Sequence, residues 1–107
     1  MEEPVIFRNL DKVRFIIQEA TNLDVGYAYE DFVFSEHGLF IIRFNDEDDN
    51  ILYCYFNKDC IKAKRKQLLT DLTNIAFLNG VKIIYKGKFE MEQLEGLDEF
   101  ELKLYEN

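Results

Sequence analysis

The chain has 107 residues, a formal net charge of −8 from 21 acidic and 13 basic residues, and a hydrophobic content of 48%. This length suits one domain and is too short for two ordinary ones, so we expect a single domain over residues 1–107. The hydrophobic content can fill a core, which excludes a disordered chain. The acidic surface repels phosphate backbones and anionic lipids, which argues against nucleic acid and membranes as partners.

Several features indicate the cytoplasm as the compartment. The longest apolar runs are about five residues, whereas a helix that spans a bilayer needs about 20. Residues 1–4 (MEEP) are acidic and lack the basic start of a secretory signal. Cys54 and Cys60 are too few for a disulfide framework and are interpreted as reduced thiols that act as small hydrophobic residues.

The first half of the chain predicts one helix and then three strands. Leu10, Val13 and Ile17 have the spacing of an amphipathic helix over residues 10–22, which Asn9 or Asp11 can cap. Strands are predicted over residues 27–34, 39–44 and 51–56, joined by a tight turn at 35–38 and an acidic loop at 45–50. Short turns between consecutive strands favour an antiparallel meander.

The second half predicts a helix and two further strands. The helix begins at a cap on Asp59, runs to about Asn79 and is closed by Gly80. A fourth strand covers residues 81–85, a loop covers 87–96, and a fifth strand covers 100–104. The predicted fold is therefore α+β, with two helices, a five-stranded and mainly antiparallel sheet, and the order α-β-β-β-α-β-β.

This element order, together with the small size and the acidity, resembles the type III secretion chaperones. Members of that family dimerise and hold secreted proteins through exposed apolar surface. The resemblance covers most of the chain but rests on order, size and charge, so it assigns no functional residue. It implies a non-enzymatic homodimer that binds another protein. The predicted elements lack the additional helix that the family usually has after its last strand.

No residue pattern indicates catalysis, a cofactor or a metal. The loop at 46–50 partly matches a calcium loop, but Ile51 stands where the bend needs Gly, and Asn57 where calcium needs a bidentate Glu. His37 is the single histidine and has no recognisable catalytic or zinc-binding partners. The glycines are isolated, so no phosphate-binding loop is present. We expect no enzyme, no cofactor and no metal site.

Both faces of the second and third predicted strands are apolar. Phe40, Ile42 and Phe44 share one face of their strand, and Ile41 lies on the other. Two helices can cover one face of the sheet but hardly both. The second face is therefore predicted to be an exposed protein interface, because a contiguous apolar patch with Tyr and Arg is typical of contact surfaces. Its residues are Leu39, Ile41, Arg43, Ile51, Tyr53 and Tyr55. The alternative is that the sheet curls, or that residues 5–7 fold over this face.

A cluster of basic residues stands out in this acidic chain. It consists of Lys58, Lys62, Lys64, Arg65 and Lys66, at the start of the second helix. The cluster is interpreted either as a solvated face or as a docking patch, for an acidic partner or for the acidic C-terminal segment of the chain itself.

The function that these patterns favour is a non-enzymatic protein-interaction module, forming a homodimer through the apolar outer sheet face. Two alternatives stay open. One is an acidic decoy or immunity-type inhibitor that binds a basic target through the acidic residues at 46–49 and 90–101. The other is a small enzyme that uses scattered carboxylates, which sequence patterns alone do not exclude.

Overall fold

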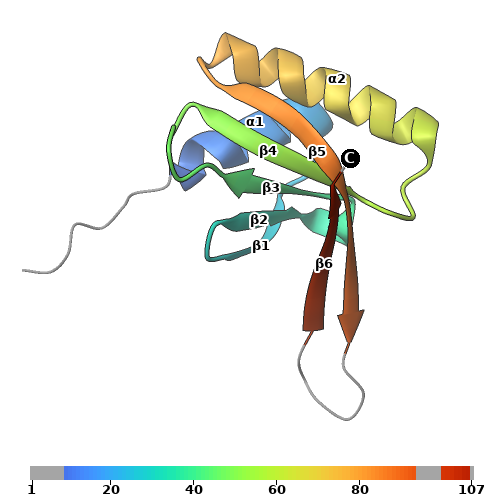
Figure 1. Ribbon diagram of the computed structural model, residues 1–107. Coiled ribbons are helices and arrows are strands. Elements are labelled where there is room, and N and C mark those ends of the chain that lie inside the picture. Colours follow the sequence, from blue (N-terminus) through green and yellow to red (C-terminus); the bar gives the residue numbers. More distant parts are fainter. Residues whose placement is uncertain (1–8, 94–99, 107) are drawn as a thin grey trace, which may run out of the picture.

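The computed structural model describes residues 9–93 and 100–106, and in these ranges two helices lie on one face of a six-stranded mixed sheet (Figure 1). The elements are α1 (Leu10–Thr21), β1 (Val25–Tyr29), β2 (Phe32–Ser35), η1 (Glu36–Gly38), β3 (Phe40–Phe44), β4 (Ile51–Asn57), α2 (Lys62–Leu78), β5 (Lys82–Gln93) and β6 (Phe100–Glu106). The strands follow chain order across the sheet, and each neighbouring pair is antiparallel except β4–β5, which α2 connects. The α+β class with two helices is as predicted, whereas the sheet has one strand more than expected.

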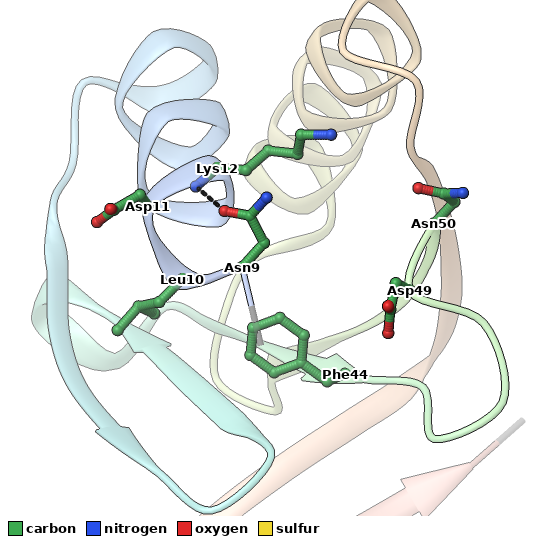
Figure 2. Close-up of a pocket in the computed structure, with 7 residues that line it drawn as sticks. All are labelled: Asn9, Leu10, Asp11, Lys12, Phe44, Asp49 and Asn50. Atoms are coloured by element: carbon green, nitrogen blue, oxygen red, sulfur yellow. Dashed lines mark hydrogen bonds between the residues drawn. The ribbon is translucent and has the colours of Figure 1, made fainter. Parts of the chain in front are cut away.

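Helix α1 agrees with its sequence pattern. Asn9 caps the helix, and its side-chain oxygen accepts a hydrogen bond of 3.1 Å from the backbone N–H of Lys12 (Figure 2). This bond satisfies one of the backbone donors that a helix leaves unpaired at its start. Val13, Ile16 and Ile17 form the buried stripe. Together these features place α1 against the sheet with its apolar side inward.

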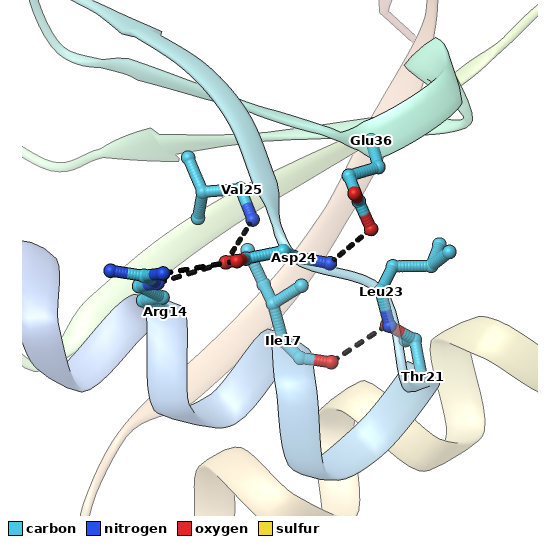
Figure 3. A network of polar contacts seen from close by, with 7 residues as sticks. All are labelled: Arg14, Ile17, Thr21, Leu23, Asp24, Val25 and Glu36. Carbon is cyan, nitrogen blue, oxygen red and sulfur yellow. Dashed lines mark hydrogen bonds and ion pairs between the residues drawn. The ribbon is translucent and has the colours of Figure 1, made fainter.

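A polar network connects α1 to the start of β1 and to η1 (Figure 3). Arg14 donates two hydrogen bonds, of 2.8 and 3.0 Å, to the two carboxylate oxygens of Asp24. The backbone N–H of Val25 also donates to Asp24, and the backbone N–H of Asp24 donates to the Glu36 carboxylate at 2.8 Å. The hydrogen bond from Arg14 and that from the backbone of Val25 hold the pKa of Asp24 below its usual range. The network sets the direction in which the chain enters the sheet.

The predicted strand over residues 27–34 is two strands, β1 and β2, joined by a tight turn at Glu30 and Asp31. Glu30 adopts a left-handed conformation with φ of 54°, which is uncommon for a residue other than glycine. The turn contains Asp31, a common turn residue, but no Gly, Pro or Asn, so the sequence carries only a weak signal for the reversal. The hairpin pairs Tyr27 with Phe34 and Tyr29 with Phe32.

The predicted start of α2 is wrong. The helix begins at Lys62, and the residue before it, Ile61, makes no side-chain cap. Asp59 lies in a turn, where its backbone N–H donates to the side chain of Asn57 at 2.8 Å. The end of the helix is as predicted, since Gly80 follows it with φ of 76°, the left-handed conformation that often terminates helices.

The core on the helix face is continuous, and the side-chain alternation predicted for β3 and β4 is confirmed. Phe40, Ile42 and Phe44 point toward the helices, as do Leu52, Cys54 and Phe56. Its other members are Val13, Ile16, Ile17, Val33, Cys60, Leu68, Leu72, Ala76, Val81 and Ile83. A second buried cluster of Ile41, Tyr55 and Phe89 lies on the opposite face of the sheet.

Strand β5 does not end at residue 85; it spans 12 residues, Lys82–Gln93, and passes an irregularity between Tyr85 and Gly87. Cys54 pairs with Tyr85, whereas Tyr55 pairs with Gly87, so Lys86 is an extra residue on β5. An extra residue reverses the faces on which the following side chains lie. Ile83 therefore packs against the helix-face core, and Phe89 packs on the opposite face.

Gly87 is needed where β6 approaches β5. A Cβ atom at Gly87 would lie 2.0 Å from the carbonyl oxygen of Tyr105, well inside van der Waals contact. The absence of a side chain thus lets β6 pair closely with β5 as both strands leave the plane of the meander (Figure 1). The loop predicted from residue 87 onward is therefore a strand as far as Gln93.

Candidate functional site

The prediction of an exposed patch on the outer sheet face is wrong for Ile41 and Tyr55, the two residues that were placed near its centre. Ile41 and Tyr55 have no exposed surface and pack with Phe89. The phenol of Tyr55 also donates a hydrogen bond of 2.7 Å to Glu106 at the end of β6. The physical reason is that the second half of β5 and β6 curl over this face. The alternative stated from the sequence, that the sheet curls, therefore explains why these two residues are buried.

The other four predicted interface residues do not form one patch. Leu39 packs against the helix-face core, on the side of the sheet opposite to the one predicted. It precedes β3 and has a helical backbone conformation, so the alternation of the strand does not extend to it. Ile51 is partly exposed at the start of β4. The Arg43 guanidinium lies 5.3 Å from the ring centroid of Phe32, and its Nε lies 3.2 Å from the carboxylate of Asp31.

Tyr53, also among the predicted interface residues, makes polar contacts on the outer face. Its hydroxyl accepts a hydrogen bond of 3.0 Å from the side-chain amide of Asn45. The Lys86 ammonium lies 4.9 Å from the centroid of its ring. Lys86 is in turn 4.0 Å from the Glu106 carboxylate. These contacts occupy Tyr53 within its own chain.

An apolar groove lies on the outer face between the first hairpin and the last two strands. We call it the aromatic groove. It has a volume of about 990 Å³ and is lined by Tyr27, Tyr29, Glu30, Phe32, Phe34, Met91, Phe100 and Leu102. These residues come from β1 and β2 and the turn between them at one edge of the sheet, and from β5 and β6 at the other edge. The same curl that buries Ile41 therefore brings the two edges of the sheet to one groove.

The groove has large exposed side chains at its rim, and at its base Phe34 packs against the buried cluster. Tyr27, Tyr29 and Phe100 are 58%, 56% and 59% exposed. Phe34 is partly buried, and its ring makes an edge contact with that of Phe89, with centroids 6.3 Å apart. Exposed apolar surface thus continues directly into the buried cluster, which holds the wall of the groove in place.

The charge within the groove is negative. Glu30 lies beside Tyr29, and its negative charge and a hydrogen bond from the phenol raise the pKa of Tyr29. Within residues 9–93 and 100–106, no ion pair joins Glu30 to a lysine or an arginine. The nearby cation Arg43 is paired with Asp31. The described lining is thus largely apolar and contains one acidic group, Glu30.

Sequence reasoning did not identify the lining residues of this groove. A signal was present, because Phe100, Leu102 and Leu104 alternate along the last strand. Tyr27, Tyr29, Phe32 and Phe34 also share one face, but only once a turn is placed at 30–31. The pattern of each strand predicts an apolar face but does not say that the two faces meet.

The basic residues singled out in the sequence differ in their surroundings. Lys58 binds Glu90 at 2.9 Å, and Glu90 accepts a second hydrogen bond from the Tyr105 hydroxyl at 2.9 Å. Lys62, Lys64 and Lys66 are exposed on α2, and Arg65 is partly exposed. The contact made by Lys58 corresponds to the alternative in which the cluster meets the acidic C-terminal part of the same chain.

The remaining acidic segments show local pairing. Glu92 binds Lys103 at 3.0 Å, and Glu101 is exposed on β6. In the loop at 46–50, the backbone N–H of Asn50 donates to the side chain of Asp48 at 2.8 Å, which is a turn contact. Residues 5–7, predicted as a possible cover of the outer face, lie outside the described residues. The same holds for residues 94–99, which belong to the predicted loop and to the predicted acidic segment.

The candidate reactive groups are spread over the fold. Cys54 is fully buried, and burial raises the pKa of its thiol. Cys60 is buried at the turn before α2, while His37 is exposed in η1. Among the described residues, no group of three or more His, Cys, Asp or Glu side chains is placed to hold a metal ion.

A second hollow lies at the start of α1, with a volume of about 430 Å³ (Figure 2). Its lining includes Asp11, Lys12 and Asp49. The two carboxylates stand on opposite sides of the hollow and do not converge on one point. In the described lining, these two carboxylates are therefore not placed to act together as an acid–base pair.

Comparison with known protein families, with curated protein sequences and with solved structures finds no match to this chain. Within the described ranges, no helix is both long enough and apolar enough to cross a membrane. The aromatic groove is therefore the feature of the molecule from which a function can be inferred.

Proposed function

We propose that the protein is a non-enzymatic, chaperone-like interaction module that holds an apolar segment of a partner protein in the aromatic groove. The observation that carries the proposal is the meeting of exposed apolar side chains from both sheet edges in one groove. Monomeric proteins rarely leave such contiguous surface exposed unless it makes contacts. Tyrosine and phenylalanine are also the residues that contribute most to contact surfaces, since rigid rings bury large areas at low entropic cost.

The chemistry of the groove supports binding over catalysis. Among the described lining residues Glu30 is the single carboxylate, and the others are Tyr, Phe, Met and Leu. The phenol of Tyr29 donates a hydrogen bond to Glu30 and holds its proton, because the charge of Glu30 raises the pKa of Tyr29, so the described lining presents no activated nucleophile beside this carboxylate. The homodimer predicted from the sequence stays a prediction, and sedimentation velocity over a range of concentrations tests it.

A displayed library of random peptides tests the proposed function. Wild-type protein is expected to select apolar peptides, and Tyr29→Ser and Phe100→Ser are expected to lose them. Phe77→Ser is the matched control, because Phe77 is 78% exposed but lies on α2. All three substitutions remove an exposed ring, so they should leave the fold intact by circular dichroism.

Two results would contradict the proposal. One is the absence of any selected peptide. The other is equal loss of binding in the Phe77→Ser control, which would show that binding follows general surface hydrophobicity and not the groove.

A further inference from the structure

We infer that the aromatic groove recognises an arginine side chain of its partner, at a subsite formed by Tyr27, Tyr29 and Glu30. The inference deepens the proposed function and rests on it. The occupant is a segment of a different protein in which an arginine is flanked by apolar residues. The apolar residues fill the groove, and the guanidinium lies against the two tyrosines.

The two tyrosine rings offer faces to a planar cation. Tyr27 and Tyr29 are successive outer-face residues of β1, with ring planes 10° from parallel and centroids 6.4 Å apart. Both are more than half exposed, so their faces are open to a ligand. Aromatic faces attract cations through their quadrupole, and guanidinium groups in particular stack on them.

The charge beside these rings complements a guanidinium. Glu30 follows Tyr29 directly and lines the same groove. In the part of the chain that the structure describes, no cationic side chain forms an ion pair with it. A carboxylate can accept two parallel hydrogen bonds from arginine, which lysine cannot supply. Phenol faces and an acid therefore favour arginine over neutral apolar residues.

The net charge of the chain favours a basic segment of another protein over a second copy of this chain as the occupant of the groove. A net charge of −8 attracts a basic segment and repels a second copy of the same chain. Arg43, a cation on the same face that lies over the ring of Phe32, is paired with Asp31 and so opposes an incoming arginine weakly. Charge complementarity thus points to a basic partner and away from self-association through this groove.

The probes are synthetic copies of the peptides that the random library yields against the wild-type protein. Arginine is expected to be enriched in them. Replacing that arginine with citrulline, its neutral isostere, is expected to weaken binding by about tenfold, as loss of a cation–π contact and an ion pair predicts. Isothermal titration of each pair of peptides measures the ratio.

Two variants locate the effect. Glu30→Gln and Tyr29→Leu are each expected to reduce the arginine-to-citrulline ratio by about threefold or more, since one removes the charge and the other a ring face. Glu47→Gln is the matched control. Glu47 is an exposed acid in the loop before β4, so this substitution changes the net charge equally but should leave the ratio unchanged.

The outcomes separate this inference from the function on which it rests. Selected peptides that lack arginine, or that bind equally well with citrulline, overturn the arginine subsite but leave the interaction module standing. An equal effect of Glu47→Gln also overturns it, because net charge alone would then explain the preference. A dimer that Tyr29→Leu dissociates overturns it in favour of a second copy. Failure to select any peptide overturns both.

Discussion

The close approach of β6 to β5 can be tested by adding one methyl group, in Gly87→Ala. The new Cβ atom would lie 2.0 Å from the carbonyl oxygen of Tyr105 and 2.9 Å from the Cα of Glu106. Both atoms belong to the backbone, so no flexible side chain can move aside. The two strands must separate, and β6 carries Leu102 and Leu104, which cover the second buried cluster.

The expected cost has two parts. Overpacking a closely packed site costs about 1–3 kcal/mol. The φ of Gly87, 155°, is a conformation that other residues rarely adopt, and holding one there costs about 1–3 kcal/mol more. We therefore expect a loss of about 2–6 kcal/mol in the free energy of unfolding. This is a large fraction of the roughly 5–15 kcal/mol that a domain has.

Urea unfolding followed by circular dichroism measures this loss. Gly38→Ala is the control, because Gly38 also has a positive φ, of 62°, but has no atom within 4 Å of an added Cβ. Its cost should be about 1 kcal/mol, from the left-handed conformation alone. Equal costs for the two variants would refute the close contact between β5 and β6, and with it the explanation of the curl.

Three further predictions follow from burial and pKa. Ile41→Asp places an unpaired carboxylate at a fully buried position, so circular dichroism should show an unfolded domain. A variant that stays folded but associates less would instead support the interface predicted on the outer face. Leu72→Ala, on the buried stripe of α2, should cost about 2–5 kcal/mol, and Lys64→Ala at most about 0.5 kcal/mol; equal costs in urea unfolding would show that α2 faces the other way. Burial and the hydrogen bond to Glu106 raise the pKa of Tyr55 above 10.0, so its contribution to stability is present below pH 10 and is lost as the pH rises through the raised pKa. Tyr55→Phe should reduce this alkaline loss in urea titrations, and an unchanged slope would assign the loss to other groups.

Local periodicity was sufficient for the helices and for the central strands. The stripe of α1 and the cap at Asn9 depend on residues within one or two helical turns. The two faces of β3 and β4 follow in the same way from the alternation of neighbouring side chains. Prediction failed where the local signal was weak, as in the turn at Glu30, or misleading, as at Asp59, which lies in a turn before the uncapped start of α2.

Burial of the outer face could not be derived from these patterns. The apolar residues at 41 and 55 were correctly placed on the face away from the helices, but their exposure was inferred from the number of helices available to cover a sheet. The sheet covers this face itself. Gly87 was interpreted as an isolated turn glycine, although it is the point at which β5 changes the face of its side chains.

The sequence alone therefore determined the secondary structure near each strong pattern and the side of the sheet on which β3 and β4 place their residues. Tertiary structure decided which of those residues a partner can reach. The reason is that curling depends on a backbone contact between Gly87 and Tyr105, which are 18 positions apart in the chain (105 − 87), and on pairing between β5 and β6. The aromatic groove depends on the same curl, since Tyr27 and Phe100 lie 73 positions apart in the chain (100 − 27), on the two edge strands of the sheet, and line one surface because the sheet curls.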